Sequence, residues 1–156
     1  MMDRDSVFQI VVGVDGSRES RLALDWALDE ARLRRGRVRV VTGWELPTAT
    51  VGMEVPAGGR DACERVAQRI QRRALSAVSV DGVEVTRDVR EGSASAVLLE
   101  AADDADLLVV GSRGLGGFTR LLLGSVSNQV AHHAGCPVLI VRPRPAPRPS
   151  VQERRT

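Results

Sequence analysis

The stretch ADLLVVGSRGLGGFTRLLLGSVS, residues 105–127, decides how the chain is interpreted. It opens with a continuous apolar run, which is typical of a strand buried on both faces. Five glycines follow between residues 111 and 124, and a helical pattern begins at Ser125. The stretch therefore predicts a buried strand that leads through a glycine-rich loop into a helix.

The same alternation of apolar runs and helical patterns extends over the rest of the chain. Strands separated by helices favour a parallel sheet with right-handed crossovers and helices on both faces. We therefore expect an α/β fold with one Rossmann-like domain. Strands are predicted at 9–14, 38–44, 83–89, 105–111 and 136–141, and helices at 17–36, 61–78, 93–104 and 125–135.

Three of these elements carry further local expectations. Gly36 is placed to end the first helix. In the second helix Ala62, Val66, Ile70 and Ala74 recur every four residues, which predicts its buried face, and its arginines are expected in solvent. The strand at 83–89 alternates valines with polar residues, as a half-exposed strand near a sheet edge does.

Composition and charge exclude several classes of protein. The chain has 156 residues and a net charge of +2, but the segment 142–156 alone carries +4, which leaves −2 for the rest. Four scattered aromatic residues and no basic face argue against nucleic-acid binding. No apolar run is long enough to cross a membrane. The start of the chain lacks the features of a secretory signal, so we expect a cytoplasmic protein with two free thiols, Cys63 and Cys136.

The chain is expected to divide into one domain at 5–142 and an arginine- and proline-rich tail at 143–156, disordered or extended. The loop 45–59 contains two prolines and three glycines. It either folds over a ligand or is a mobile connector.

Two strand ends carry the candidate site. Val14, Asp15, Gly16 and Ser17 leave the first strand, where a carboxylate can face the crevice in which α/β sheets bind ligands. The alternative is a strand-to-helix turn capped by the aspartate or the serine.

The second strand end fits the spacing Gly-x2-Gly-x9-Gly-Ser, with Gly111, Gly114, Gly124 and Ser125. Glycines let backbone amides approach an anion, and the free amides at a helix start favour negative charge. Together with the hydroxyls of Ser125 and Ser127, these groups predict phosphate binding. Arg113 and Arg120 lie within the loop and either touch phosphate or stay in solvent. A P-loop is excluded, because the GxxxxGK[ST] pattern and lysine itself are absent.

This spacing, together with VVGVDGS near the start and VRVVTGWE at the second strand, resembles the ATP-binding branch of the universal stress protein family. The resemblance implies the strand order 3-2-1-4-5 and homodimers that pair through the last strand, 138–141. It implies ATP with Mg²⁺ as the ligand and Asp15 near the phosphates and the metal. Gly43 then lies at the adenine, Gly111 and Gly114 at the ribose and phosphates, and Gly124, Ser125, Val126 and Ser127 around the triphosphate.

Three functions remain open from the sequence. The first is a dimeric module that binds ATP, responds to its occupancy in stress signalling and has an unknown protein partner. The second is a weak ATPase or self-phosphorylating protein, with Ser125 and Ser127 as candidate acceptors. The third is a dimeric scaffold that binds no nucleotide. No catalytic base is evident, because His132 and His133 lie two turns beyond the glycine loop.

Overall fold

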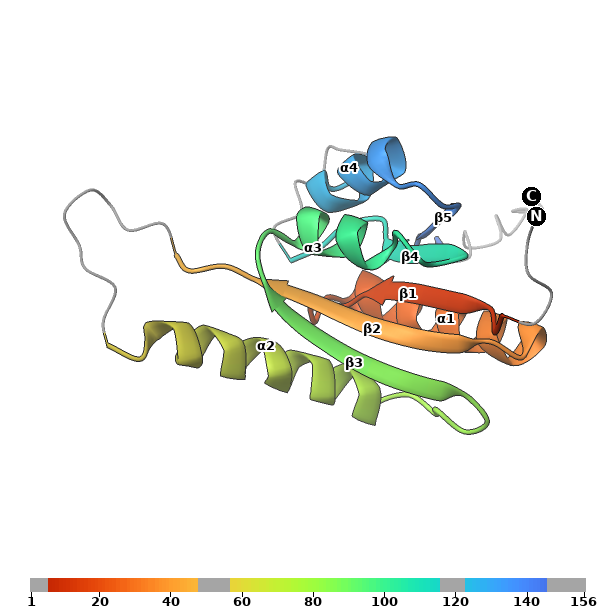
Figure 1. The fold of residues 1–156 in the computed structure, drawn as a ribbon, viewed down its shortest axis with the longest axis horizontal. Helices are drawn as coiled ribbons and strands as arrows, with labels where there is room; N and C mark the ends of the chain where they lie inside the picture. The colour runs from red at the N-terminus through yellow and green to blue at the C-terminus, as the bar shows by residue number, and fades with distance from the viewer. Residues whose placement is uncertain (1–5, 48–56, 116–122, 146–156) are drawn as a thin grey trace, which may run out of the picture.

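The computed structural model describes residues 6–47, 57–115 and 123–145, and within them five parallel strands form one sheet (Figure 1). The strand order is β3-β2-β1-β4-β5. This confirms both the predicted parallel sheet and the order that the resemblance implied. The strands are β1 (Gln9–Gly13), β2 (Arg37–Trp44), β3 (Glu84–Glu91), β4 (Leu107–Gly111) and β5 (Val138–Val141).

Helices cover both faces of the sheet, as predicted; they are α1 (Arg18–Arg34), α2 (Gly59–Ser76), α3 (Ala94–Ala101) and α4 (Ser125–His133). Figure 1 shows α3 and α4 on one side of the strands and α2 on the other. Two apolar clusters result from the alternation of side chains along β1. Ile10 and Val12 pack against α1 and α2, whereas Val11 packs against α3 and α4.

Element ends differ from the predictions by at most three residues. β1 ends at Gly13, although Val14 stays buried and its amide donates to the Val41 carbonyl at 3.0 Å. β3 continues to Glu91, since it pairs with β2 as far as Trp44. α1 ends before Gly36, because Arg35 takes the left-handed conformation at φ 53° and closes the last turn.

The predicted buried face of α2 is confirmed in its second half, where Ala74 is buried and Ile70 packs against the core, and is wrong in its first half. Ala67, Gln71 and Ala74 are buried, whereas Ala62 is exposed and Val66 is 48% exposed. Gln71 enters the core because its Nε2 donates to the Val40 and Asp88 carbonyls, both at 3.0 Å. These hydrogen bonds to strand carbonyls remove most of the free-energy cost of burying the side-chain amide. Ala62 and Val66 are thereby turned away from the centre of the sheet.

Two further predictions concern exposure and the thiols. β3 forms one edge of the sheet and β5 the other, as expected for the half-exposed strand and for the last strand. Cys63 and Cys136 are both free.

None of the helices in the described ranges is long and apolar enough to cross a lipid bilayer. The tail beyond residue 145, and most of the loop 45–59, lie outside the described residues.

Candidate functional site

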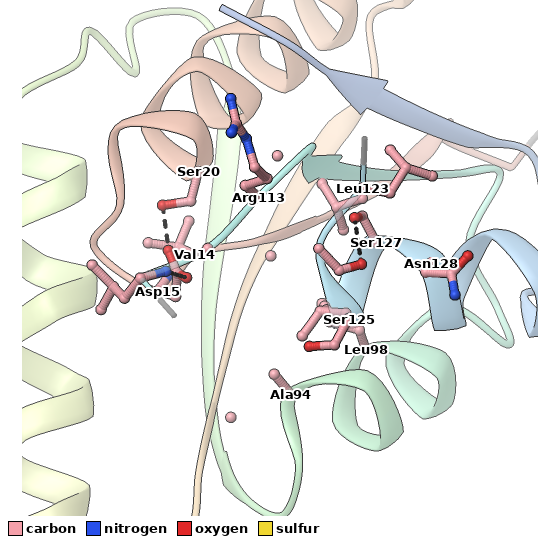
Figure 2. A pocket seen from close by; sticks show the side chains of 18 of the residues that line it. Val14, Asp15, Ser20, Ala94, Leu98, Arg113, Leu123, Ser125, Ser127 and Asn128 are labelled. Atoms are coloured by element: carbon pink, nitrogen blue, oxygen red, sulfur yellow. Dashed lines mark hydrogen bonds between the residues drawn. The ribbon is translucent and has the colours of Figure 1, made fainter. Parts of the chain in front are cut away.

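A cavity of about 720 Å³ opens at the carboxyl ends of β1, β2 and β4, where the strand order reverses (Figure 2). Parallel sheets bind their ligands at this place. The structure brings all ten residues of the predicted site to its wall: Val14, Asp15, Gly43, Gly111, Arg113, Gly114, Gly124, Ser125, Val126 and Ser127. Segments about a hundred residues apart in the sequence therefore meet around one space.

The turn between β1 and α1 fixes the carboxylate of Asp15 at the cavity. Its Oδ1 accepts a hydrogen bond from the Ser17 amide at 2.9 Å, and its Oδ2 accepts one from the Leu115 amide at 3.2 Å. Ser17 caps α1, since its Oγ accepts from the Ser20 amide at 3.1 Å. Both alternatives drawn from the sequence thus hold together: Asp15 belongs to a capped turn and also faces the cavity.

Gly114 lies against that carboxylate. A Cβ at Gly114 would fall 2.5 Å from Asp15 Oδ2, which is closer than any unbonded carbon and oxygen approach. A side chain at residue 114 would therefore displace the carboxylate or the loop. The glycine serves the contact between the two loops, in addition to any approach of a ligand.

Gly111 lacks a side chain for a different reason. A Cβ there would fall 2.7 Å from the carbonyl carbon of Glu19, in the first turn of α1. The backbones of β4 and α1 are thus in direct contact beside the cavity. The packing of α1 on the sheet accounts for this glycine, which the sequence could only attribute to a ligand.

The beginning of α4 supplies hydrogen-bond donors, but fewer than predicted. The Gly124 amide already donates to the Ser112 carbonyl at 2.8 Å. Ser127 is buried, and its Oγ lies 3.0 Å from both the Ser112 and the Gly124 carbonyls, to which it donates. The single hydroxyl proton of Ser127 therefore holds the loop rather than a ligand.

The donors that remain at this helix start are the amides of Ser125, Val126 and Ser127, together with the exposed hydroxyl of Ser125. Amides in the first turn of a helix have no partner within the helix, and the helix dipole favours an anion in front of them. The side chain of Val126 packs instead against the apolar cluster beneath α3 and α4.

Arg113 lines the cavity through the part of its chain near the backbone. In Figure 2 its guanidinium extends away from both Asp15 and Ser125. This orientation favours the solvent alternative for Arg113. Arg120 lies outside the described residues.

Sequence reasoning missed the apolar wall of the cavity. Ala94 and Leu98 of α3 face it, together with Val41, Val110 and Leu123. Their apolar pattern is the same as that of ordinary core residues, so only the serine cap of α3 at Ser93 marked this helix start in the sequence. The cavity thus combines an apolar wall with amides and a hydroxyl that can face an anion.

The sequence model of the universal stress protein family matches residues 7–142. The chain belongs to the universal stress protein family. It is 40% identical over 147 residues to a universal stress protein of Mycolicibacterium smegmatis, an alignment that covers 90% of this chain and 47% of that protein. The chain therefore spans about half the length of the curated relatives it matches.

Solved structures agree with this assignment. The universal stress protein UspA of Lactobacillus plantarum superposes with a TM-score of 0.71 at 21% identity, over 88% of this chain and all of that one. A universal stress protein in complex with cAMP superposes with a TM-score of 0.56 at 30% identity, over 88% of this chain and 98% of that one. The first shows the shared fold, and the second is a family member that binds a nucleotide.

Ionisable groups are sparse around the cavity of this universal stress protein. Asp15 is the single carboxylate among the described residues that line it, and neither His132 nor His133 reaches it. The shifted groups lie elsewhere: burial raises the pKa of Asp25, and a hydrogen bond to Asp88 raises the pKa of Arg90. The described part of the cavity therefore contains no acid–base pair.

Proposed function

We propose that this universal stress protein binds ATP with Mg²⁺ in the cavity at the carboxyl ends of β1, β2 and β4. We further propose that it acts as a nucleotide-dependent regulatory module in stress response. The observation that carries the proposal is that one cavity combines an apolar wall with unpaired hydrogen-bond donors. The apolar wall at Ala94 and Leu98 suits a purine, and the start of α4 offers its free amides to phosphate. The volume of the cavity, about 720 Å³, lies within the range of small-molecule sites, about 300–1,000 Å³.

The residues present fit a magnesium ion that arrives with the nucleotide. Mg²⁺ in nucleotide sites takes one or two carboxylates and completes its shell with phosphate oxygens and water. Asp15 supplies one carboxylate, and each of its oxygens keeps a lone pair beside the amide hydrogen bond that it accepts. The described residues contain no group of three or more metal-ligating side chains. Asp15 would thus hold a metal that neutralises phosphate charge.

Binding without efficient turnover is the form of this function that the cavity supports best. Phosphoryl transfer requires a positioned nucleophile and a charge clamp around the transferred group. Ser127 has its proton engaged with backbone carbonyls, so Ser125 is the better placed of the two serines for self-phosphorylation.

Equilibrium binding tests the proposal directly. The nucleotide content of the purified protein is measured after denaturation, and Mg-ATP, AMP and cAMP are titrated by calorimetry. We expect ATP to bind most tightly and to need Mg²⁺ for its full affinity. A protein that is isolated empty and binds none of the three would overturn the proposal. Labelled ATP in the same samples shows whether phosphate is released or transferred to protein.

A homodimer through β5 and a cytoplasmic location complete the proposal. β5 is an edge strand whose residues Val138, Leu139 and Ile140 are half-buried and apolar. An apolar edge strand invites pairing with another strand. A second copy of the chain would cover it, and the nucleotide would then act on the surface that the dimer presents to a protein partner.

A further inference from the structure

A second cavity, of about 450 Å³, lies between the end of β2 and the first half of α2. It shares three wall residues with the larger cavity: Asp15, Gly43 and Leu115. In Figure 2 the pale yellow helix α2 stands on the side of Asp15 opposite Ser125. Asp15 thus separates two spaces, and only one of them is explained by the proposed function.

The wall that α2 contributes to this cavity includes apolar residues that the core leaves out. Because Gln71 takes the central position over β2 and β3, Ala62 and Val66 face the second cavity instead. Ile70 packs against the core and also lines this cavity. Val66 remains 48% exposed, and Leu115 on the opposite wall is 72% exposed. Both lose this exposure to water if an apolar group enters, which favours occupancy.

The charged residues among the described lining of this cavity are both acidic. They are Asp15 and Glu45, and Trp44 adds an aromatic ring, the side chain that attracts a cation most strongly through its π face. No arginine or histidine is among the described lining residues, although α2 carries Arg60, Arg65, Arg69, Arg72 and Arg73. Such a wall excludes anions and attracts a cation that bears an apolar group.

We propose that the second cavity binds a small organic cation, an ammonium or guanidinium group attached to an apolar body, and that its occupancy weakens binding of the Mg-bound nucleotide through Asp15. The apolar body packs on Val66, Ile70 and Leu115, while the cationic head faces Glu45, Trp44 and Asp15. The coupling rests on the proposed function, whereas binding of the cation itself does not.

The coupling follows from the position of Asp15 on both walls. In the proposed function this carboxylate holds the Mg²⁺ that arrives with the nucleotide in the larger cavity, and a cation on its other side repels that metal. Because coupling between two sites is reciprocal, the Mg-bound nucleotide weakens binding of the cation by the same factor.

Cys63 provides a reporter inside the cavity, since it lines the second cavity and is half-exposed. The rate of its alkylation by N-ethylmaleimide is followed by mass spectrometry in nucleotide-free protein. The probes are 2-phenylethylamine and 3-phenylpropionate, which share the aromatic body and differ in the sign of the charge. We expect the amine to protect Cys63 several-fold and saturably, and the acid to give no protection.

Two surface variants of α2 form a matched pair for this experiment. Ala62→Trp places an indole in the cavity and should abolish protection by the amine, whereas Arg65→Trp adds the same group to an exposed position off the cavity wall and should preserve it. Glu45→Gln should weaken the amine several-fold. Equal protection by amine and acid, no protection by either, or full protection in Ala62→Trp would overturn the proposal.

Calorimetry then measures the coupling: 2-phenylethylamine should lower the affinity for Mg-ATP by about fivefold. An unchanged ATP affinity with a protected Cys63 would overturn the coupling and leave the cation site standing. A protein that binds the amine but no nucleotide would instead overturn the proposed function alone.

Discussion

The carboxylate of Asp15 accepts a hydrogen bond from the backbone amide of Leu115, 3.2 Å away. Asp15 follows β1, and Leu115 follows β4, the neighbouring strand in the sheet. This contact joins the turn after β1 to the glycine loop after β4, the two segments from which the candidate site is built.

The Asp15→Asn variant tests this joint. The asparagine side chain has one acceptor oxygen where the carboxylate has two, and its NH₂ group cannot accept. Either the Ser17 amide or the Leu115 amide therefore loses its partner. We expect a loss of about 1–2 kcal/mol in the free energy of unfolding, measured with urea, and about tenfold weaker Mg-ATP binding. Asp103→Asn, at an exposed position outside both cavities, should change neither value. Unaltered ATP affinity in Asp15→Asn would show that the carboxylate does not meet the nucleotide.

The Gly114→Ala variant tests the closeness of the two loops. Its Cβ would stand 2.5 Å from Asp15 Oδ2, so the loop or the carboxylate must shift. We expect nucleotide binding measured by calorimetry to weaken by about tenfold or more, because a shift of 1 Å in a binding site is costly. The control is Gly135→Ala, where a Cβ meets nothing within 4 Å. Equal affinities in the two variants would contradict the role given to this loop.

Ser127 and Ser125 are expected to behave differently. Ser127→Ala removes the buried hydroxyl that donates to the Ser112 and Gly124 carbonyls. It should lower the free energy of unfolding by about 1 kcal/mol, because both carbonyls keep a backbone donor. Ser125→Ala removes an exposed hydroxyl, so it should leave stability almost unchanged and weaken ATP instead. Denaturant melts and calorimetry on both variants separate the two effects. The opposite pattern would mean that Ser127 is the ligand contact.

The thiols should differ in their response to pH. Burial raises the pKa of the Cys136 thiol, and the thiolate is the form that reacts. Maleimide should therefore label Cys63 before Cys136 near neutral pH, and Cys136 should catch up as the pH rises. The folded state disfavours the Cys136 thiolate, so stability should fall as the pH rises above the ordinary thiol range. Peptide mass spectrometry across pH reads the rates, with Cys136→Ser as the control for assignment.

The edge of β5 should be the dimer contact. The Pro137 and Val141 carbonyls bond to β4, so by the alternation along a strand Ile140 turns its amide outward. Ile140→Pro removes that outward donor and keeps the bonds to β4. Sedimentation should show a wild-type dimer and a monomeric variant with an intact circular dichroism spectrum. A monomeric wild type at high micromolar concentration would rule out this contact.

The sequence predicted the sheet because apolar runs, and one strand that alternates valines with polar residues, are separated by helices, a pattern that leaves few topologies. It also predicted which residues meet at the cavity, since the glycines and Asp15 mark two strand ends by local chemistry. The apolar wall at Leu98 and the buried Gln71 stayed hidden, because their surroundings come from other elements. The engaged hydroxyl of Ser127 stayed hidden for the same reason: its acceptor at Ser112 lies fifteen residues away.

The contact between Gly111 and the backbone of Glu19 means that position 111 cannot take a side chain without moving α1 on the sheet. We therefore expect changes of ligand preference to arise where side chains line the cavity, for example at Ala94 and Leu98 of α3. There the size of one apolar side chain limits the size of the group admitted. A protein engineer seeking to accommodate a larger base would begin at Leu98 and leave the glycine loop untouched.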